Sequence, residues 1–171
     1  MKKAFIFLIA IFLLCNLVSC SGTATNQEII SNELGIDIAS GNIETYTDTH
    51  GGFHGDGETY SKITFSDDSF YNEIKNNTDW SPFPLTPNLT VVVYGGTDPN
   101  GDSWESFIKD ENDNPLIPEI SNGYYFFIDR HSDFKNNKKD DSKIFDRHSM
   151  NFTLAIYDIT SKTLYFYAID T

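Results

Sequence analysis

The distribution of apolar residues predicts a chain built mainly from short strands. The strongest patterns lie in the last third, at residues 123–129, 152–158 and 164–169, which are apolar or aromatic at nearly every position. Strands that are apolar on both faces are typical of the middle of a sheet with at least partial cover on each side. The last two are joined by residues 159–163, a length suited to an antiparallel hairpin.

Weaker patterns predict three further strands in the first two thirds of the chain. One is expected at residues 42–47 and another at residues 59–66, where Ile63 and Phe65 alternate with polar neighbours. The valine-rich residues 89–94 predict a buried strand that ends at two glycines.

Two short helices are expected beside these strands. Thr25 and Glu28 have the spacing of a capping box, and Gly35 is well placed to end the helix, so residues 26–34 are predicted to be helical. A second helix is predicted at residues 68–76, following an aspartate pair that can cap it.

Three segments do not fit a regular element. Three prolines within residues 80–87 exclude a helix and a central strand, so we expect an ordered connection there. Residues 97–118 are acidic and irregular, apart from one possible helical turn at residues 104–108. Residues 132–146 hold four lysines among asparagines and aspartates and are interpreted as a mobile, solvated loop.

Together these patterns predict an α+β fold. We expect a single domain, residues 26–171, with a mostly antiparallel sheet of five to six strands and two short helices, preceded by a cleaved signal helix. Phe, Tyr and Trp make up 15% of the chain and are the expected core material.

The first nineteen residues have the layout of a secretory signal peptide. Lys2 and Lys3 precede an apolar run from residue 4 to residue 14, and small residues close the segment. Even if residues 4–19 form one helix, its length of roughly 24 Å is shorter than the hydrocarbon core of a bilayer. The segment is therefore expected to be a secretion signal and not a membrane-spanning helix.

The end of this segment, Leu17, Val18, Ser19 and Cys20, resembles the lipobox of bacterial lipoproteins. The resemblance implies that Cys20 is lipidated and becomes the first residue of the mature protein, with residues 20–25 as a short tether. The alternative is an ordinary signal peptide with a cysteine near its end. Multiple acyl chains on one cysteine would hold the protein at the extracytoplasmic face of the cell membrane.

The remaining chain is strongly acidic. The leader contains two of the twelve basic residues and none of the twenty-five acidic ones, so residues 20–171 have a formal charge of −15. This charge argues against a nucleic-acid partner and against electrostatic adhesion to an anionic bilayer. Since Cys15 lies in the leader and Cys20 is the expected anchor, the domain has no thiol available for a disulfide, a zinc site or a nucleophile.

The most unusual stretch is DTHGGFHGDGE, at residues 48–58, with four glycines and two histidines in eleven residues. Its glycines permit positive φ or close backbone approach, which predicts a shaped loop between two strands. Histidines beside aspartates can bind a metal or act as a general base, but they can also form internal hydrogen bonds. The glycines break the helix that a zinc-protease HExxH motif requires.

Two copies of the tetrapeptide DRHS supply the other histidines. The candidates for a ligand or metal site built on the glycine loop are thus Asp48, His50, His54 and Asp56 of the loop itself, with His131 and His148 opposite. The metal is unknown, no residue is assigned a catalytic role and no cofactor is expected. Residues 98–105 have oxygen ligands, but Gly101 stands at the wrong position for a calcium loop of the EF-hand type.

Several longer sequence segments resemble those of a known protein family. LGIDIASG, DTHGGFHGDGETY, SPFPLT, NGYYFFIDRHS and NFTLAIYDITSKTLYFYAIDT resemble a family of small uncharacterised lipoproteins and secreted proteins of Gram-positive gut bacteria. The resemblance covers residues 34–171 and implies a single domain and a surface location. It implies no activity, cofactor or catalytic residue.

These observations lead to three functional hypotheses. The first is a membrane-anchored, monomeric binding or interaction module that is not an enzyme. The second is a small metal-dependent or hydrolytic enzyme that uses the glycine loop. The third is an immunity or inhibitor protein, which suits the small size and acidic charge but has no motif behind it.

Overall fold

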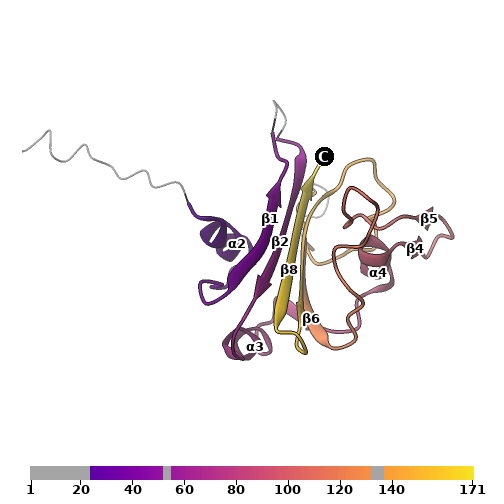
Figure 1. The fold of residues 1–171 in the computed structure, drawn as a ribbon. Helices are drawn as coiled ribbons and strands as arrows, with labels where there is room; N and C mark the ends of the chain where they lie inside the picture. The colour runs from indigo at the N-terminus through magenta and orange to yellow at the C-terminus, as the bar shows by residue number, and fades with distance from the viewer. Residues whose placement is uncertain (1–23, 52–54, 132–136) are drawn as a thin grey trace, which may run out of the picture.

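A six-stranded antiparallel sheet organises the computed structural model, which describes residues 24–51, 55–131 and 137–171 (Figure 1). The order across the sheet is β1-β2-β8-β7-β6-β3, so β1 and β3 are its two edges. The strands are β1 (Asn42–Asp48), β2 (Gly57–Thr64), β8 (Thr163–Asp170), β7 (Asn151–Asp158), β6 (Gly123–Asp129) and β3 (Trp80–Pro82). The α+β fold and the antiparallel sheet predicted from the sequence are confirmed.

Helices cover both faces of this sheet. Within the described residues there are three helices, one more than predicted: α2 (Asn26–Leu34), α3 (Ser69–Ile74) and α4 (Pro87–Tyr94). Figure 1 shows α2 and α3 on one side of the sheet and α4 on the other. Beyond α4, β4 (Gly96–Thr97) and β5 (Ser103–Trp104) form a small separate ribbon.

The middle strands supply apolar side chains to both faces because neighbouring residues of a strand point in opposite directions. In β8, Phe166 packs in the cluster beneath α2 and α3, whereas Tyr167 packs in the cluster beneath α4. Both side chains are almost completely buried. The prediction that the three C-terminal strands lie in mid-sheet with cover on each face is therefore confirmed.

The first helix forms as its sequence predicts. The Thr25 hydroxyl accepts a hydrogen bond from the Glu28 amide at 3.2 Å, and the Glu28 carboxylate accepts one from the Thr25 amide at 2.7 Å. Gly35 ends the helix in the left-handed conformation, with a φ of 63°. Ile30 and Leu34 face the core.

The predicted strand at residues 89–94 is wrong, because this segment is helix α4. Thr86 caps the helix by accepting a hydrogen bond from the Leu89 amide at 3.1 Å, and Pro87 occupies the first turn. Proline is well suited to this position because its ring presets a helical φ and the missing amide proton would have no partner. Three of the valines are buried, so burial and capping outweigh the strand preference of valine.

Two other sequence-based interpretations need correction. The possible helical turn at residues 104–108 is absent from the described structure, where Trp104 instead ends the short strand β5. The part of the lysine-rich loop that is described, residues 137–146, is not simply solvated, because Ile144 is fully buried and the Phe145 ring packs against Trp104 in a tilted arrangement with ring centroids 4.9 Å apart. Hydrophobic contacts thus fix this segment against the core below α4.

The predicted signal peptide (residues 1–19), Cys20 and most of the tether lie outside the described residues. Among the helices that are described, none combines the length and apolar character needed to cross a membrane.

Candidate functional site

A polar network lies at one end of the sheet, where β1 and β8 end and β2 begins. His50 follows β1, and its Nδ1 atom lies 2.7 Å from Oδ1 of Asp48 and 3.2 Å from the Thr59 hydroxyl. Its other ring nitrogen, Nε2, is 3.4 Å from Oδ2 of Asp170 on β8. Asp48 also accepts a hydrogen bond from the His50 amide at 3.0 Å. The imidazole is therefore held between two carboxylates that come from different strands.

Arg130 extends the network across the sheet. Its guanidinium donates to Oδ2 of Asp170 at 2.7 Å and to Oε1 of Glu33 on α2 at 2.9 Å. It also donates to the hydroxyl of Thr153, a residue of β7 that is only 1% exposed. That hydroxyl donates in turn to Glu33 at 2.5 Å. Helix α2 is in this way fastened to the sheet by a charged bridge.

A glycine makes room for this arrangement. A Cβ atom at Gly57 would lie 2.5 Å from the backbone nitrogen and Cα of His50. This is closer than real Cβ contacts allow, so the start of β2 can approach the histidine only without a side chain. The close backbone approach expected of the glycine loop occurs at this position.

The hydrogen bonds around Asp48 favour the charged form of this carboxylate. The hydrogen bond from the His50 amide, followed by the one from its side chain, lowers the pKa of Asp48 below its ordinary value. Both ring nitrogens of the histidine already face internal partners. Within the described residues, no three histidine, cysteine or carboxylate side chains converge in the manner of a metal site.

The other predicted loop residues are placed differently. Asp56 is exposed, and His54 lies outside the described residues. His131 is half-buried after β6, where its amide donates to Oδ1 of Asp129 at 2.8 Å, and His148 is exposed. The contacts that hold His50 involve neither His131 nor His148.

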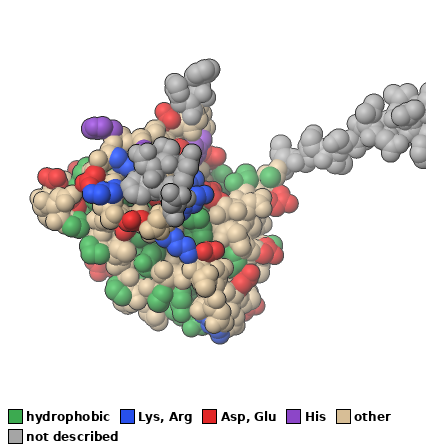
Figure 2. All heavy atoms as spheres, turned by 180° about the vertical axis from the view of Figure 1, so that it is seen from behind, with side chains coloured by type: hydrophobic (Ala, Val, Ile, Leu, Met, Phe, Trp, Pro, Cys, Tyr) green, Lys and Arg blue, Asp and Glu red, His purple; other side chains and the backbone are tan. Residues whose placement is uncertain are grey.

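The two DRHS copies have different roles. Asp129 of the first copy forms a buried ion pair with Arg147 of the second, at 2.6 Å. Arg130 of the first copy instead joins the network with Glu33. Figure 2 shows acidic and basic side chains close together on the face that it presents.

Residues 98–105, which resemble a calcium-binding loop in their oxygen ligands, bind their first carboxylate, Asp98, through donors of the same segment. Asp98 accepts hydrogen bonds from the Asn100 amide at 2.8 Å, the Asp102 amide at 2.9 Å and the Trp104 indole at 3.0 Å. Burial acts to raise the pKa of Asp98, but these hydrogen bonds outweigh burial and lower the pKa. The segment is a closed turn stabilised by its own donors.

A groove lies on the face of the sheet that carries α4, between strands β1 and β2 and the segment 109–116. We call it the β1–β2 groove; its volume is about 470 Å³, within the range of ligand sites. Its lining residues are Thr45, Thr47, Thr49, Glu58, Tyr60, Lys109, Asp110, Glu111, Asn112, Leu116 and Tyr167. Three threonines thus line the groove together with a wall that is rich in polar residues.

The groove is electrically negative. Lys109 is neutralised by Asp113 at 2.6 Å and Glu105 at 2.5 Å, and these hydrogen bonds raise its pKa. Within the described part of the chain, by contrast, no ion pair neutralises Glu58 or Glu111. Burial and then the charge of Glu58 raise the pKa of Tyr167.

The groove is bordered by the edge strand β1, whose outer backbone groups face away from the sheet. The Thr49 amide donates to the Glu58 carbonyl at 2.9 Å, so this pair is hydrogen-bonded across β1 and β2. Since hydrogen-bonded and non-hydrogen-bonded pairs alternate in an antiparallel ladder, the backbone groups of Tyr46 and Asp48 point outward. These positions are available to pair with another strand.

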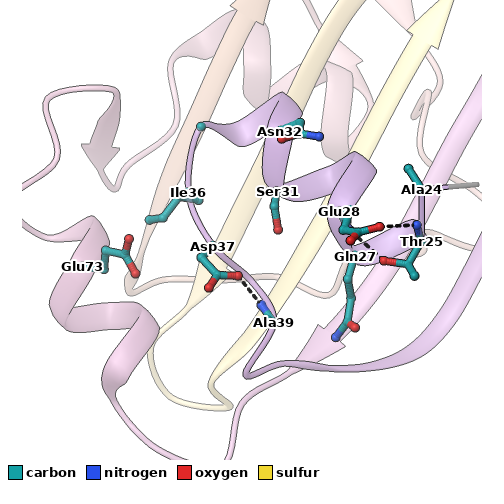
Figure 3. Close-up of a pocket in the computed structure, with 11 residues that line it drawn as sticks. Ala24, Thr25, Gln27, Glu28, Ser31, Asn32, Ile36, Asp37, Ala39 and Glu73 are labelled. Atoms are coloured by element: carbon teal, nitrogen blue, oxygen red, sulfur yellow. Dashed lines mark hydrogen bonds between the residues drawn. The ribbon is translucent and has the colours of Figure 1, made fainter. Parts of the chain in front are cut away.

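A larger hollow, of about 970 Å³, lies beside α2, on the face of the sheet that carries α2 and α3 (Figure 3). Two of its carboxylates are occupied by backbone caps: Glu28 accepts from the Thr25 amide and Asp37 accepts from the Ala39 amide at 2.8 Å. Figure 3 shows Glu73 on α3, across from the helix. None of the residues that line this hollow belongs to a strand, so the β1–β2 groove is the better candidate for recognition of an extended chain.

The sequence pattern indicates Asp48 and His50 as site residues but does not indicate most of their partners. Glu33, Thr153 and Asp170 are distant in sequence and lie in ordinary helix and strand patterns, so no local signal marked them. The groove, by contrast, had a local signal in the alternation of threonines at 45, 47 and 49, which is typical of an exposed strand face.

Comparisons with protein-family models, with curated proteins and with solved structures found no match to this chain.

Proposed function

We propose that this protein is a lipid-anchored, extracytoplasmic binding module that recognises its partner through the β1–β2 groove. The observation that carries the proposal is the groove itself, a negative hollow of about 470 Å³ beside a strand with outward backbone groups. The His50 network is the other candidate site, but its polar groups bind one another and fasten α2, β7 and β8 together. This internal use favours the groove as the binding surface.

The proposed location rests on the sequence of the leader. The lipobox-like ending at Cys20 and the resemblance to small Gram-positive lipoproteins both favour attachment to the outer face of the cell membrane. The described domain begins only a few residues later, at α2, so it would be held close to the membrane surface. The acidic charge would keep it off an anionic bilayer, and we propose that it acts as a monomer without nucleic-acid partners.

The anchor is tested by the substitution Cys20→Ser in the full chain, expressed in a Gram-positive host. We expect lipid labelling of the unmodified protein to require Cys20, and the variant to appear in the medium or to accumulate unprocessed. Recovery of the unmodified protein in a cleaved form that carries no lipid would contradict the anchoring part of the proposal.

The groove is tested by photo-crosslinking in the same cells. Replacing Thr47 with benzoylphenylalanine places a reactive group in the groove, whereas the same replacement at Thr90, which is exposed on α4, serves as the control. We expect a discrete adduct from position 47 and none from position 90. Equal labelling from both positions, or none from either, would contradict the groove as the binding surface.

A further inference from the structure

We infer that the partner is an extended, cationic peptide segment that adds to β1 as a further strand of the sheet and places alternate side chains in the β1–β2 groove. This inference rests on the proposed function and goes beyond it by naming the chemistry and the geometry of the partner. Strand addition of this kind obtains affinity from main-chain hydrogen bonds and specificity from pockets for alternate side chains.

The first support is the asymmetry of the two sheet edges. β3 has three residues and ends in Pro82, which cannot donate a hydrogen bond, so this edge is poorly suited to pairing. β1 has seven residues without a proline, and its register with β2 is regular from Thr45 to Asp48. The outward groups of Tyr46 and Asp48 therefore offer a short, regular template for one more strand.

The second support is the position of the groove relative to that edge. Thr45 and Thr47 point into the groove, while the backbone of the intervening Tyr46 faces outward. In a strand added to β1, every second side chain would lie on the groove side, towards Glu58 and the wall formed by residues 109–116. One peptide can thus use the edge and the groove together.

The third support is charge. Glu58 and Glu111 are groove carboxylates without ion-pair partners among the described residues, whereas Lys109 is bound to two carboxylates of its own. Lysine or arginine side chains of a partner would complement this surface. A second copy of this chain is disfavoured as the partner, because residues 20–171 carry a formal charge of −15 and two copies would repel each other.

The test uses the full chain, purified in detergent, and three labelled peptides of equal length. The first alternates threonine and lysine, the second alternates threonine and glutamate, and the third is the lysine peptide with an N-methyl group on every backbone nitrogen, so that neither of its edges can donate to β1. Fluorescence anisotropy measures the Kd of each at low and at physiological salt. We expect only the unmethylated lysine peptide to bind, with a Kd that increases with salt.

A matched pair of protein variants locates the contact. Glu111→Lys reverses a charge in the groove, whereas Glu119→Lys makes the same change at an exposed residue that does not line it. We expect the groove variant to weaken peptide binding about fivefold and the control less than about twofold, in line with the modest strength of exposed ion pairs. Because both residues are exposed, both variants should keep the thermal transition of the unmodified protein.

Each alternative result has a defined meaning. Equal binding of the methylated peptide would overturn strand addition, and equal binding of the glutamate peptide would overturn the cationic partner. Failure of the lysine peptide to bind, together with a crosslink from position 47, would overturn this inference alone. Failure of both experiments would overturn the inference and the proposed groove function together.

Discussion

At the scale of single residues, a glycine decides whether the polar network can form. Gly57 touches the backbone of His50 so closely that a methyl group would require the two strands to separate. At Gly51, in the same loop, the nearest neighbour of an added methyl group would be the Thr49 carbonyl oxygen at 3.9 Å, so this position lacks the constraint. The structure therefore requires glycine at position 57 but leaves room for a side chain at position 51.

The substitution Gly57→Ala should lower the free energy of unfolding by about 1–3 kcal/mol, the usual cost of forcing an extra carbon into a packed site. The matched control, Gly51→Ala, should change it by less than about 0.5 kcal/mol. Urea denaturation of both variants measures the difference. Equal stability of the two would show that the approach of Gly57 to His50 is not needed.

At the scale of elements, the C-terminal strand β8 holds the sheet together. It lies between β2 and β7, and its side chains contribute to the clusters on both faces. Phe166 is 1% exposed and packs beneath α2 and α3, whereas Ile29 on α2 is 43% exposed. The two residues are both large and apolar but have opposite environments.

Removing residues 164–171 should therefore leave the protein without a cooperative thermal transition, since the net stability of a domain is typically about 5–15 kcal/mol and several buried side chains are lost. Phe166→Ala alone should cost about 3–5 kcal/mol. Ile29→Ala should cost less than about 1 kcal/mol because the side chain is largely solvated. Scanning calorimetry or circular dichroism measures all three. A truncated protein with an unchanged melting temperature would mean that β8 is peripheral.

The elements differ in how clearly the local sequence encodes them. Strands β6, β7 and β8 and helix α2 were predicted because their signals are local: two-sided apolar runs and a capping box. Helix α4 was missed because a short, continuous apolar run does not distinguish a buried strand from a buried helix. Thr86 and Pro87 were the signals that could have decided it.

At the scale of the whole molecule, ionisable groups set the pH range of stability. Hydrogen bonds lower the pKa of Asp48, led by the His50 amide, and of Asp110, led by the Asn114 side chain. A carboxyl whose pKa is lowered by folding stabilises the protein above its unfolded pKa of about 4, and the contribution is lost as the pH falls through the folded value. Stability should thus decline in acid.

The dependence of stability on pH in the alkaline range comes from buried tyrosines. Burial raises the pKa of Tyr60 and of Tyr157 to about 12. Their contribution is complete below the unfolded pKa of about 10 and is lost as the pH rises towards the folded value. Stability should therefore also decline in alkali.

Urea midpoints measured from about pH 3 to about pH 11 should decrease on both sides of a neutral range. Tyr60→Phe removes one hydroxyl that ionises in alkali. It also removes the hydrogen bond that this hydroxyl donates to the Leu116 carbonyl at 3.0 Å. This variant should be less stable at neutral pH but should lose less stability between neutral pH and the alkaline limit. A midpoint that does not change above about pH 10 would contradict the assigned role of the tyrosines.

The sequence by itself determined the α+β class, the central C-terminal strands, the capped first helix and the acidic charge, because these depend on composition and on contacts between near neighbours in the chain. The tertiary structure decided the rest. His50 meets Asp170, and Arg130 meets Glu33, across separations that local patterns do not encode. The β1–β2 groove likewise exists only because the segment 109–116 folds against strands that lie far earlier in the chain.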